Sequence, residues 1–130
     1  MSHQQVLRVE DLSIELPAGA DRSHAVKGIS LDVRKGEILC VIGESGSGKS
    51  VLSAAIMGDY AKGLRHSEGV IDFLGNDICR MDEPSLRQLR GNRIAMIFQE
   101  PMAALNPAIR IGQQVEEIFD IHAPQMPATE

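Results

Sequence analysis

The fold is decided by the stretch Gly43-Glu44-Ser45-Gly46-Ser47-Gly48-Lys49-Ser50. This stretch fits the pattern Gly-x-x-x-x-Gly-Lys-[Ser/Thr], which is typical of loops that bind phosphate groups. An apolar run directly before it, residues 38–42, predicts a buried strand. Residues 51–57, directly after it, favour a helix that ends at Gly58. The sequence therefore predicts the strand, loop and helix that such a loop requires.

Each residue type in the loop has a chemical role toward a polyphosphate. The glycines at positions 43, 46 and 48 adopt unusual backbone angles easily and leave no Cβ between backbone and ligand. Successive N–H groups then form an anion-binding nest, and the positive end of the following helix adds to it. We expect Lys49 to reach the β- and γ-phosphates and the Ser50 hydroxyl to ligate Mg²⁺. The predicted nucleotide-binding residues are Gly43, Glu44, Ser45, Gly46, Ser47, Gly48, Lys49, Ser50 and Val51.

Length and composition restrict the class of protein. A chain of 130 residues, 43% apolar and 24% charged, predicts one globular domain at most. The net charge of −5 argues against an extended nucleic-acid-binding surface. Residues 1–5 carry no secretion signal, and no apolar run approaches the ~18 residues of a membrane span. We therefore expect a soluble, cytoplasmic protein.

The cysteines and histidines predict no metal site. Cys40 and Cys79 lack the spacing of metal ligands. Cys40 falls inside the predicted strand, where a buried, reduced thiol is expected. The histidines at positions 24, 66 and 122 are isolated from one another and from paired acids or cysteines.

Alternating apolar residues predict an antiparallel pair of strands before the loop. The alternation runs through residues 6–16 and again through residues 24–33, and a turn at residues 17–21 separates the two stretches. Residues 59–68 show no clear period. Residues 69–78 predict two short strands around a Gly-Asn turn.

The second half of the chain predicts two helices and one more strand. Asp82 is expected to cap a helix within residues 81–90. Residues 94–98 form a second continuous apolar run and predict a second buried strand. Residues 112–122 place their apolar side chains on one stripe, which predicts an amphipathic helix that Pro124 ends.

Two motifs together resemble those of the ATP-binding cassette (ABC) ATPases. The first is the loop through Val51, and the second is Met-Ile-Phe-Gln-Glu-Pro-Met-Ala-Ala-Leu-Asn-Pro at residues 96–107. Within that superfamily the chain looks like the ATP-binding subunits of bacterial oligopeptide, dipeptide and nickel importers, from about residue 6 to residue 122. The resemblance implies an α/β fold, a P-loop NTPase core with an N-terminal antiparallel β subdomain, incomplete at the C-terminus.

The resemblance also implies three parts of one nucleotide-binding domain. Residues 1–36 would form the antiparallel β part and residues 37–99 the core up to the glutamine loop. Residues 100–130 would begin a helical subdomain. The implied cofactors are ATP and Mg²⁺, with Ser50 and Gln99 as metal ligands, and Gln99 would assist catalysis by touching the attacking water.

The partners that the resemblance implies are those of an importer. The loop from Gln99 to Pro107 would meet a coupling helix of transmembrane permease subunits. A second ATPase subunit, identical or different, would complete the site, and a periplasmic solute-binding protein would act indirectly. No nucleic-acid partner is expected. The protein would lie on the cytoplasmic face of the inner membrane and couple ATP hydrolysis to the uptake of peptide-like solutes.

The sequence departs from the family pattern in two ways. Between Leu12 and Lys35 there is no aromatic residue to stack on adenine, so that His24 or Arg22 would have to offer a weaker platform. The chain also ends before the family's Leu-Ser-Gly-Gly-Gln signature, its acidic pair and its switch histidine. We therefore expect this polypeptide alone to bind Mg·ATP weakly and to hydrolyse it hardly at all. We also expect the apolar runs at 38–42 and 94–98 to be exposed, for want of neighbouring strands.

Two other interpretations remain beside the importer ATPase. One is a truncated, non-catalytic fragment that binds nucleotide or docks on a partner. The other, a P-loop kinase or GTPase, is disfavoured because no Asn-Lys-x-Asp guanine-reading motif occurs and because Gln99 stands in a Phe-Gln-Glu-Pro context.

Overall fold

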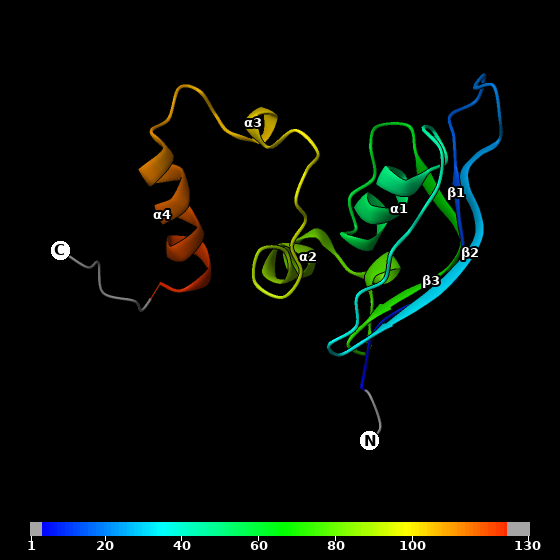
Figure 1. The fold of residues 1–130 in the computed structure, drawn as a ribbon, viewed down its shortest axis with the longest axis horizontal. Coiled ribbons are helices and arrows are strands. Elements are labelled where there is room, and N and C mark those ends of the chain that lie inside the picture. Colours follow the sequence, from blue (N-terminus) through cyan, green and yellow to red (C-terminus); the bar gives the residue numbers. More distant parts are fainter. Residues whose placement is uncertain (1–3, 125–130) are drawn as a thin grey trace. The chain divides into compact units, whose positions relative to one another are not determined.

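The computed structural model describes residues 4–124, apart from the side chains of residues 101 and 103. The chain divides into two compact units, residues 1–86 and residues 87–130. In the first unit lie β1 (Gln5–Glu15), β2 (His24–Arg34), α1 (Lys49–Ile56), β3 (Arg65–Phe73), β4 (Asn76–Asp77) and the 3-10 helix η1 (Ile78–Arg80) (Figure 1). Helix α2 (Glu83–Leu89) crosses the boundary, and the second unit continues with α3 (Pro101–Ala104) and α4 (Ile111–His122).

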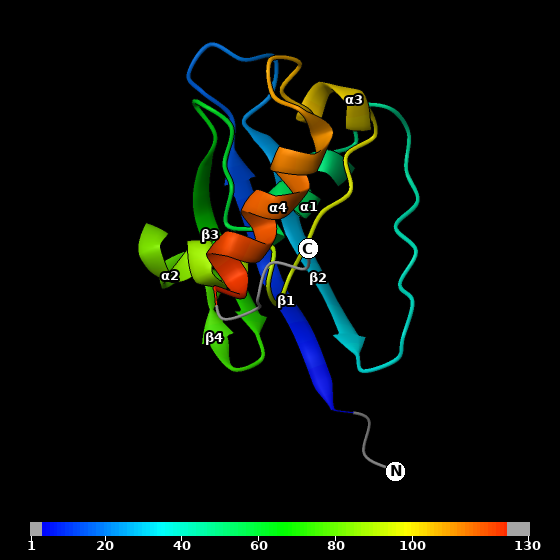
Figure 2. The ribbon, with the colours of Figure 1, turned by 90° about the vertical axis from the view of Figure 1, so that its left-hand side faces the viewer.

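Strand β1 is the centre of a four-stranded antiparallel sheet with the order β2-β1-β3-β4. It is paired on both sides, with Val9 opposite Leu31 of β2 and opposite Ile71 of β3 (Figure 2). Its side chains Leu12 and Ile14 are fully buried. The predicted antiparallel pair of strands is confirmed.

The regular alternation of β1 is interrupted at Ser13, which is buried between two buried apolar neighbours. The register shifts on both sides of this residue, and Asp11 just before it has a left-handed φ of 47°. The buried hydroxyl of Ser13 accepts a hydrogen bond of 3.0 Å from the backbone N–H of Gly28. A polar group is tolerated in this core because its hydrogen-bonding capacity is used.

Helix α1 packs against the rest of the first unit through Leu52 and Ala55, which are both buried. It ends as predicted, because Gly58 takes a left-handed φ of 67° and donates to the Ala55 carbonyl at 2.8 Å. A Cβ at position 58 would lie 2.8 Å from Cδ2 of Leu86. The helix end therefore needs glycine both for its backbone angle and for the close approach of Leu86.

Strands β3 and β4 form the predicted hairpin, with its turn one residue earlier than expected. The turn residues are Leu74 (φ 52°) and Gly75 (φ 84°), since Phe73 pairs with Asn76. Two consecutive left-handed residues are typical of a type I′ turn, whose twist suits a two-residue hairpin. Strand β3 also begins earlier than predicted, at Arg65, because its start pairs with Glu15 of β1. Pairing across the sheet defines this start, although the local sequence has no clear alternation.

The prediction of buried strands at residues 38–42 and 94–98 is wrong. Within the described residues neither run joins the sheet, and only an isolated bridge between Arg90 and Ile94 occurs in the second. Ile38 is 95% exposed and Ile97 is 94% exposed, and Cys40 is exposed as well, so that its predicted burial is also wrong. An apolar run becomes a buried strand only when a neighbouring strand satisfies its N–H and C=O groups. The expected exposure of these runs is confirmed.

Helices α2 and α4 follow the prediction in position, whereas the short helix α3 lies where a loop was expected. The Asp82 carboxylate accepts a hydrogen bond of 3.1 Å from the Ser85 N–H, which confirms the predicted cap at the start of α2. Helix α4 covers the predicted residues 112–122, and Pro124 lies just after it. The apolar stripe of α4 is not buried among the described residues, since Ile118 and Phe119 are about half exposed.

Gln114 ties the loop before α4 to the helix itself. Its amide nitrogen donates to the carbonyl oxygens of Asn106 (3.0 Å) and Ile109 (2.8 Å). Its amide oxygen accepts from the Asn106 N–H at 2.9 Å. One side chain therefore satisfies three backbone groups of the loop at residues 106–109.

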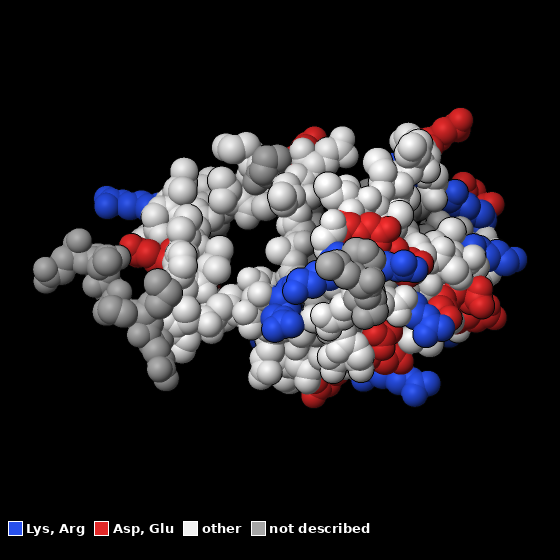
Figure 3. All heavy atoms as spheres, turned by 60° about the horizontal axis from the view of Figure 1, so that its bottom comes forward, with Lys and Arg blue, Asp and Glu red and all other residues white. Residues whose placement is uncertain are grey.

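Acidic and basic side chains are interspersed on the surface (Figure 3). Ion pairs illustrate this among the described residues, namely Arg8–Glu10, Arg34–Asp32, Arg65–Glu15 and Arg80–Asp77. Exposed pairs of this kind contribute little to stability, so that the apolar core around β1 is the main stabilising element of the first unit. Among residues 4–124, the structure shows no helix with the length and apolar character needed to cross a membrane.

Candidate phosphate-binding site

The loop before α1 takes the backbone conformation that its glycines permit. Gly46 and Gly48 have left-handed φ angles of 78° and 95°, and Gly48 is the residue at the N-terminal cap of α1. No side chain caps this helix end, so the N–H groups of its first turn stay open to a ligand. Open N–H groups at the positive end of a helix favour an anion.

Two of the glycines are also required by close contacts. A Cβ at Gly48 would lie 2.5 Å from the Ala25 carbonyl oxygen of β2. A Cβ at Gly43 would lie 2.6 Å from Oγ of Ser47. The loop is therefore folded tightly on itself and against β2.

Lys49 lies across the loop with its amino group held by loop oxygens. Its Nζ donates to the carbonyl oxygens of Gly43 and Glu44, both at 2.7 Å, and to Oγ of Ser47 at 3.1 Å. These bonds hold the positively charged amino group of Lys49 against the loop. A phosphate oxygen is a stronger acceptor than a carbonyl, because hydrogen bonds to an ionised acceptor are stronger. The amino group is thus placed to exchange its carbonyl partners for an anion.

The remaining predicted residues of the loop are accessible. Glu44 and Ser45 are exposed, and Ser50 is exposed in the first turn of α1, whereas Val51 is half-buried. Mg²⁺ bound to a nucleotide takes few protein ligands and keeps phosphate and water oxygens for the rest. An exposed hydroxyl next to Lys49 fits that requirement. Within residues 4–124, no three His, Cys, Asp or Glu side chains gather as a metal-binding group.

The first unit has a hollow at the loop and another at the β1–β2 connection. One, of about 350 Å³, is lined by the loop residues 47–49, by β2 and by Val41 and Ile42. The other, of about 710 Å³, is formed by residues 15–24 at the β1–β2 connection together with Gly63 and Arg65. At the rim of the second hollow, the hydrogen bond from Arg65 holds the pKa of the Glu15 carboxyl below its ordinary value. Both volumes are in the range of small-molecule sites.

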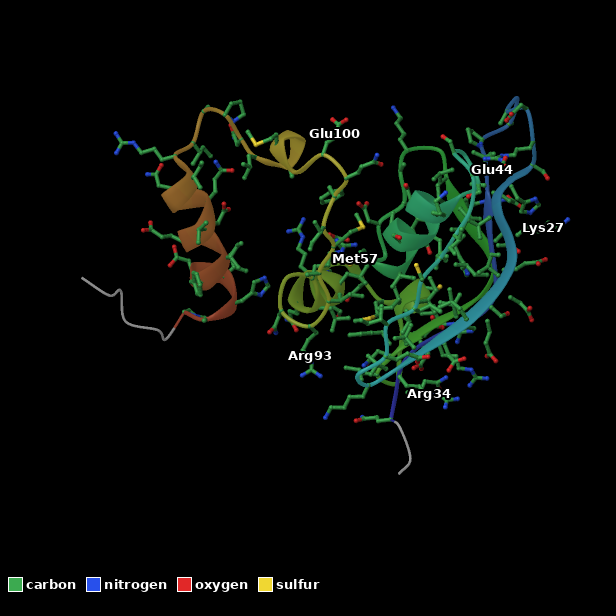
Figure 4. The ribbon with its side chains drawn as sticks, viewed as in Figure 1. Lys27, Arg34, Glu44, Met57, Arg93 and Glu100 are labelled. Carbon is green, nitrogen blue, oxygen red and sulfur yellow. The ribbon has the colours of Figure 1, made fainter. Side chains whose placement is uncertain are left out.

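Arg22 makes a contact that the sequence did not indicate. Its guanidinium donates to the carbonyl oxygen of Gly46 at 2.8 Å, which links the β1–β2 connection to the phosphate-binding loop. Figure 4 labels Glu44 of that loop, which precedes α1. His24, the other expected platform for adenine, has its ring Nδ1 2.8 Å from the Ser23 hydroxyl. Since Arg22 and Gly46 are far apart in sequence, no local pattern could have paired them.

Gln99 lies in the second unit and is exposed. It follows the apolar run at residues 94–98, directly before α3. Its predicted role beside Ser50 at a metal ion stays a prediction.

Comparison with known families decides the class of this chain. Residues 26–128, more than half of the chain, match the model of the family described as ABC transporter. The chain belongs to the ABC transporter family. The residues that match the ABC transporter model include the phosphate-binding loop and the segment around Gln99.

A solved ABC structure shows the same fold. The chain is similar to an ATP-binding cassette captured as a dimer in a post-hydrolysis state with ADP and Pi, with a TM-score of 0.61 and 18% sequence identity. The similarity covers 88% of this chain and 54% of that one. The fold is therefore the α/β fold of ABC ATPases with its antiparallel β part, as predicted.

Curated ABC relatives are similar over nearly the whole chain. A probable D,D-dipeptide transport ATP-binding protein of Escherichia coli is 44% identical over 93% of this chain and 37% of its own length. A dipeptide transport ATP-binding protein of Lactococcus lactis is 40% identical over 90% of this chain and 34% of its own length. An oligopeptide transport ATP-binding protein of the same species is 34% identical over 94% of this chain and 36% of its own length. The chain thus spans about a third of the length of these relatives.

Proposed function

We propose that this chain is the nucleotide-binding part of an ATP-binding subunit in an importer of peptides or dipeptides. The observation that carries the proposal is the loop at residues 43–50, where left-handed glycines precede an uncapped helix end and Lys49 spans the loop. The names of the relatives support the solute class, since they are transport ATP-binding proteins for dipeptides and oligopeptides.

The chain's own residues would act on Mg·ATP in three ways. The N–H groups of residues 44–50 hold phosphate oxygens at the helix end. Lys49 leaves the carbonyls of Gly43 and Glu44 and neutralises charge on the β- and γ-phosphates. Ser50 and Gln99 hold Mg²⁺, which when bound offsets the charge that develops during phosphoryl transfer. Gln99 also positions the attacking water.

The proposed partners follow from the same family. The segment from Gln99 through Pro107 contacts transmembrane permease subunits at the cytoplasmic face of the inner membrane. A second ATPase subunit pairs with this one, and a periplasmic solute-binding protein delivers the solute. The division into residues 1–36, 37–99 and 100–130 belongs to this proposal.

A titration with Mg·ATP tests the proposal. We expect Lys49→Ala to weaken binding about tenfold or more, because a charged donor to the phosphates is lost. Lys62→Ala, which changes an exposed lysine outside the loop, should leave the affinity unchanged. Isothermal calorimetry gives both dissociation constants. Equal affinities for the wild type and Lys49→Ala, or no magnesium-dependent binding by the wild type, would overturn the proposed function.

A further inference from the structure

Arg22 is a charged residue that reaches the phosphate-binding loop from a different part of the chain. It stands in the exposed connection between β1 and β2, and its guanidinium donates to the Gly46 carbonyl at 2.8 Å. It also lines the hollow of about 710 Å³ at that connection. The residue therefore connects the hollow to the loop.

The bond to Gly46 fixes one peptide plane of the loop. A peptide bond is planar and trans, so that the Gly46 carbonyl and the Ser47 N–H point in opposite directions. Holding the carbonyl therefore sets the direction of the N–H. A peptide next to glycine turns over easily because glycine accepts many backbone angles. The guanidinium opposes that motion from outside the loop, in addition to the hydrogen bonds that the loop residues make among themselves.

The neighbouring bonds hold the same turn from the other side. The Ser47 N–H donates to the Glu44 carbonyl at 3.2 Å, and Lys49 donates to that same carbonyl at 2.7 Å. When Lys49 turns to a phosphate, the second of these bonds is lost. The contact from Arg22 does not involve Lys49, so it can persist while Lys49 exchanges partners.

We propose that Arg22 is a positioning residue for phosphate binding, which acts by holding the turn at Gly46 and Ser47 from which the loop continues into α1. This inference rests on the proposed function of the loop. In the alternative, the Arg22 side chain contacts the nucleotide base. A ligand that has no base distinguishes the two roles. Inorganic tripolyphosphate has no base, so the loss of a base contact would leave its affinity unchanged.

The experiment compares wild type, Arg22→Ala and Arg22→Lys for binding of Mg·ATP and of magnesium tripolyphosphate. Arg22→Ala should weaken both ligands by the same factor, about three- to tenfold, as for loss of one charge-assisted hydrogen bond. Arg22→Lys, which keeps a charged donor, should recover most of the affinity. Arg65→Ala removes another arginine of the same hollow, one that pairs with Glu15, and should leave both affinities unchanged.

A spectroscopic measurement without ligand gives a second readout. The NMR signals of the Gly46 carbonyl carbon and the Ser47 amide should shift in Arg22→Ala and return toward wild type in Arg22→Lys. Weaker binding of Mg·ATP alone, with unchanged tripolyphosphate affinity, would overturn the positioning role and assign Arg22 to the base. Unchanged affinities in Arg22→Ala would also overturn it. If the wild type bound neither ligand, the proposed function would fail, and unchanged NMR signals in Arg22→Ala would then reject the loop contact as well.

Discussion

Gly48 shows how one residue serves two structural requirements at the candidate site. Its φ of 95° is strained for a residue with a side chain, and a Cβ there would lie 2.5 Å from the Ala25 carbonyl. Gly46 in the same loop has a similar φ of 78°, but a Cβ there would meet nothing within 4 Å. Substitution of Gly46 therefore tests the free-energy cost of a left-handed backbone alone, and substitution of Gly48 adds the cost of a steric overlap.

We expect Gly46→Ala to lower the free energy of unfolding by about 1–2 kcal/mol, through backbone strain alone. Gly48→Ala should cost more, about 2–4 kcal/mol, because β2 or α1 must also shift. Urea denaturation of both variants and of the wild type measures the difference. Equal losses in the two variants would contradict the assigned contact with Ala25.

At the scale of elements, the start of α2 depends on the ionised form of Asp82. Hydrogen bonds from the Ser85 hydroxyl and the Ser85 N–H lower the pKa of the Asp82 carboxyl below its ordinary value. A carboxyl with a depressed folded-state pKa stabilises the fold above its unfolded pKa, near 3.8. That stabilisation is lost as the pH falls through the folded-state pKa.

We therefore expect the stability of the wild type to decrease below about pH 4 in part through this cap. Asp82→Asn keeps a capping oxygen but does not titrate, so that its stability should fall less steeply over the same range. Thermal unfolding at a series of acidic pH values measures both slopes. Glu15, whose pKa is also lowered, titrates in both proteins and serves as the common background. Identical slopes would show that Asp82 contributes nothing.

The elements also show which parts of the fold the sequence could predict. Alternation located β1 and β2, and the cap at Asp82 and the glycine at position 58 located two helix ends, because these signals act within a few residues. The start of β3 at Arg65 depends on pairing with β1, which no local pattern contains. At the site, the glycines and Lys49 were predictable from spacing, whereas the contact of Arg22 with Gly46 was not.

At the scale of the whole molecule, the two continuous apolar runs were misassigned for one physical reason. Burial of residues 38–42 and 94–98 requires strands beside them, and the four described strands pair only with one another. The result is several large apolar side chains in water, with Ile38, Ile42 and Ile97 each more than nine-tenths exposed. Apolar surface of this kind favours association.

We expect the chain to associate as its concentration rises, because these side chains can be buried between copies. Sedimentation velocity at increasing protein concentration measures this. The double variant Ile38→Lys with Ile97→Lys should shift the distribution toward the monomer, since charge opposes burial. Lys substitution at Ala18, an exposed position outside both runs, is the matched control and should change little. A wild type that stays monomeric at every concentration would contradict this expectation.

The amide of Gln114 gives the region before α4 an unusual mechanical property. Since three hydrogen bonds join this one helical side chain to the backbone at Asn106 and Ile109, the loop has no free hinge against the helix. A displacement of Asn106 relative to α4 would therefore have to break hydrogen bonds to Gln114. The loop at residues 106–109 is thus joined to α4 by the side chain of Gln114.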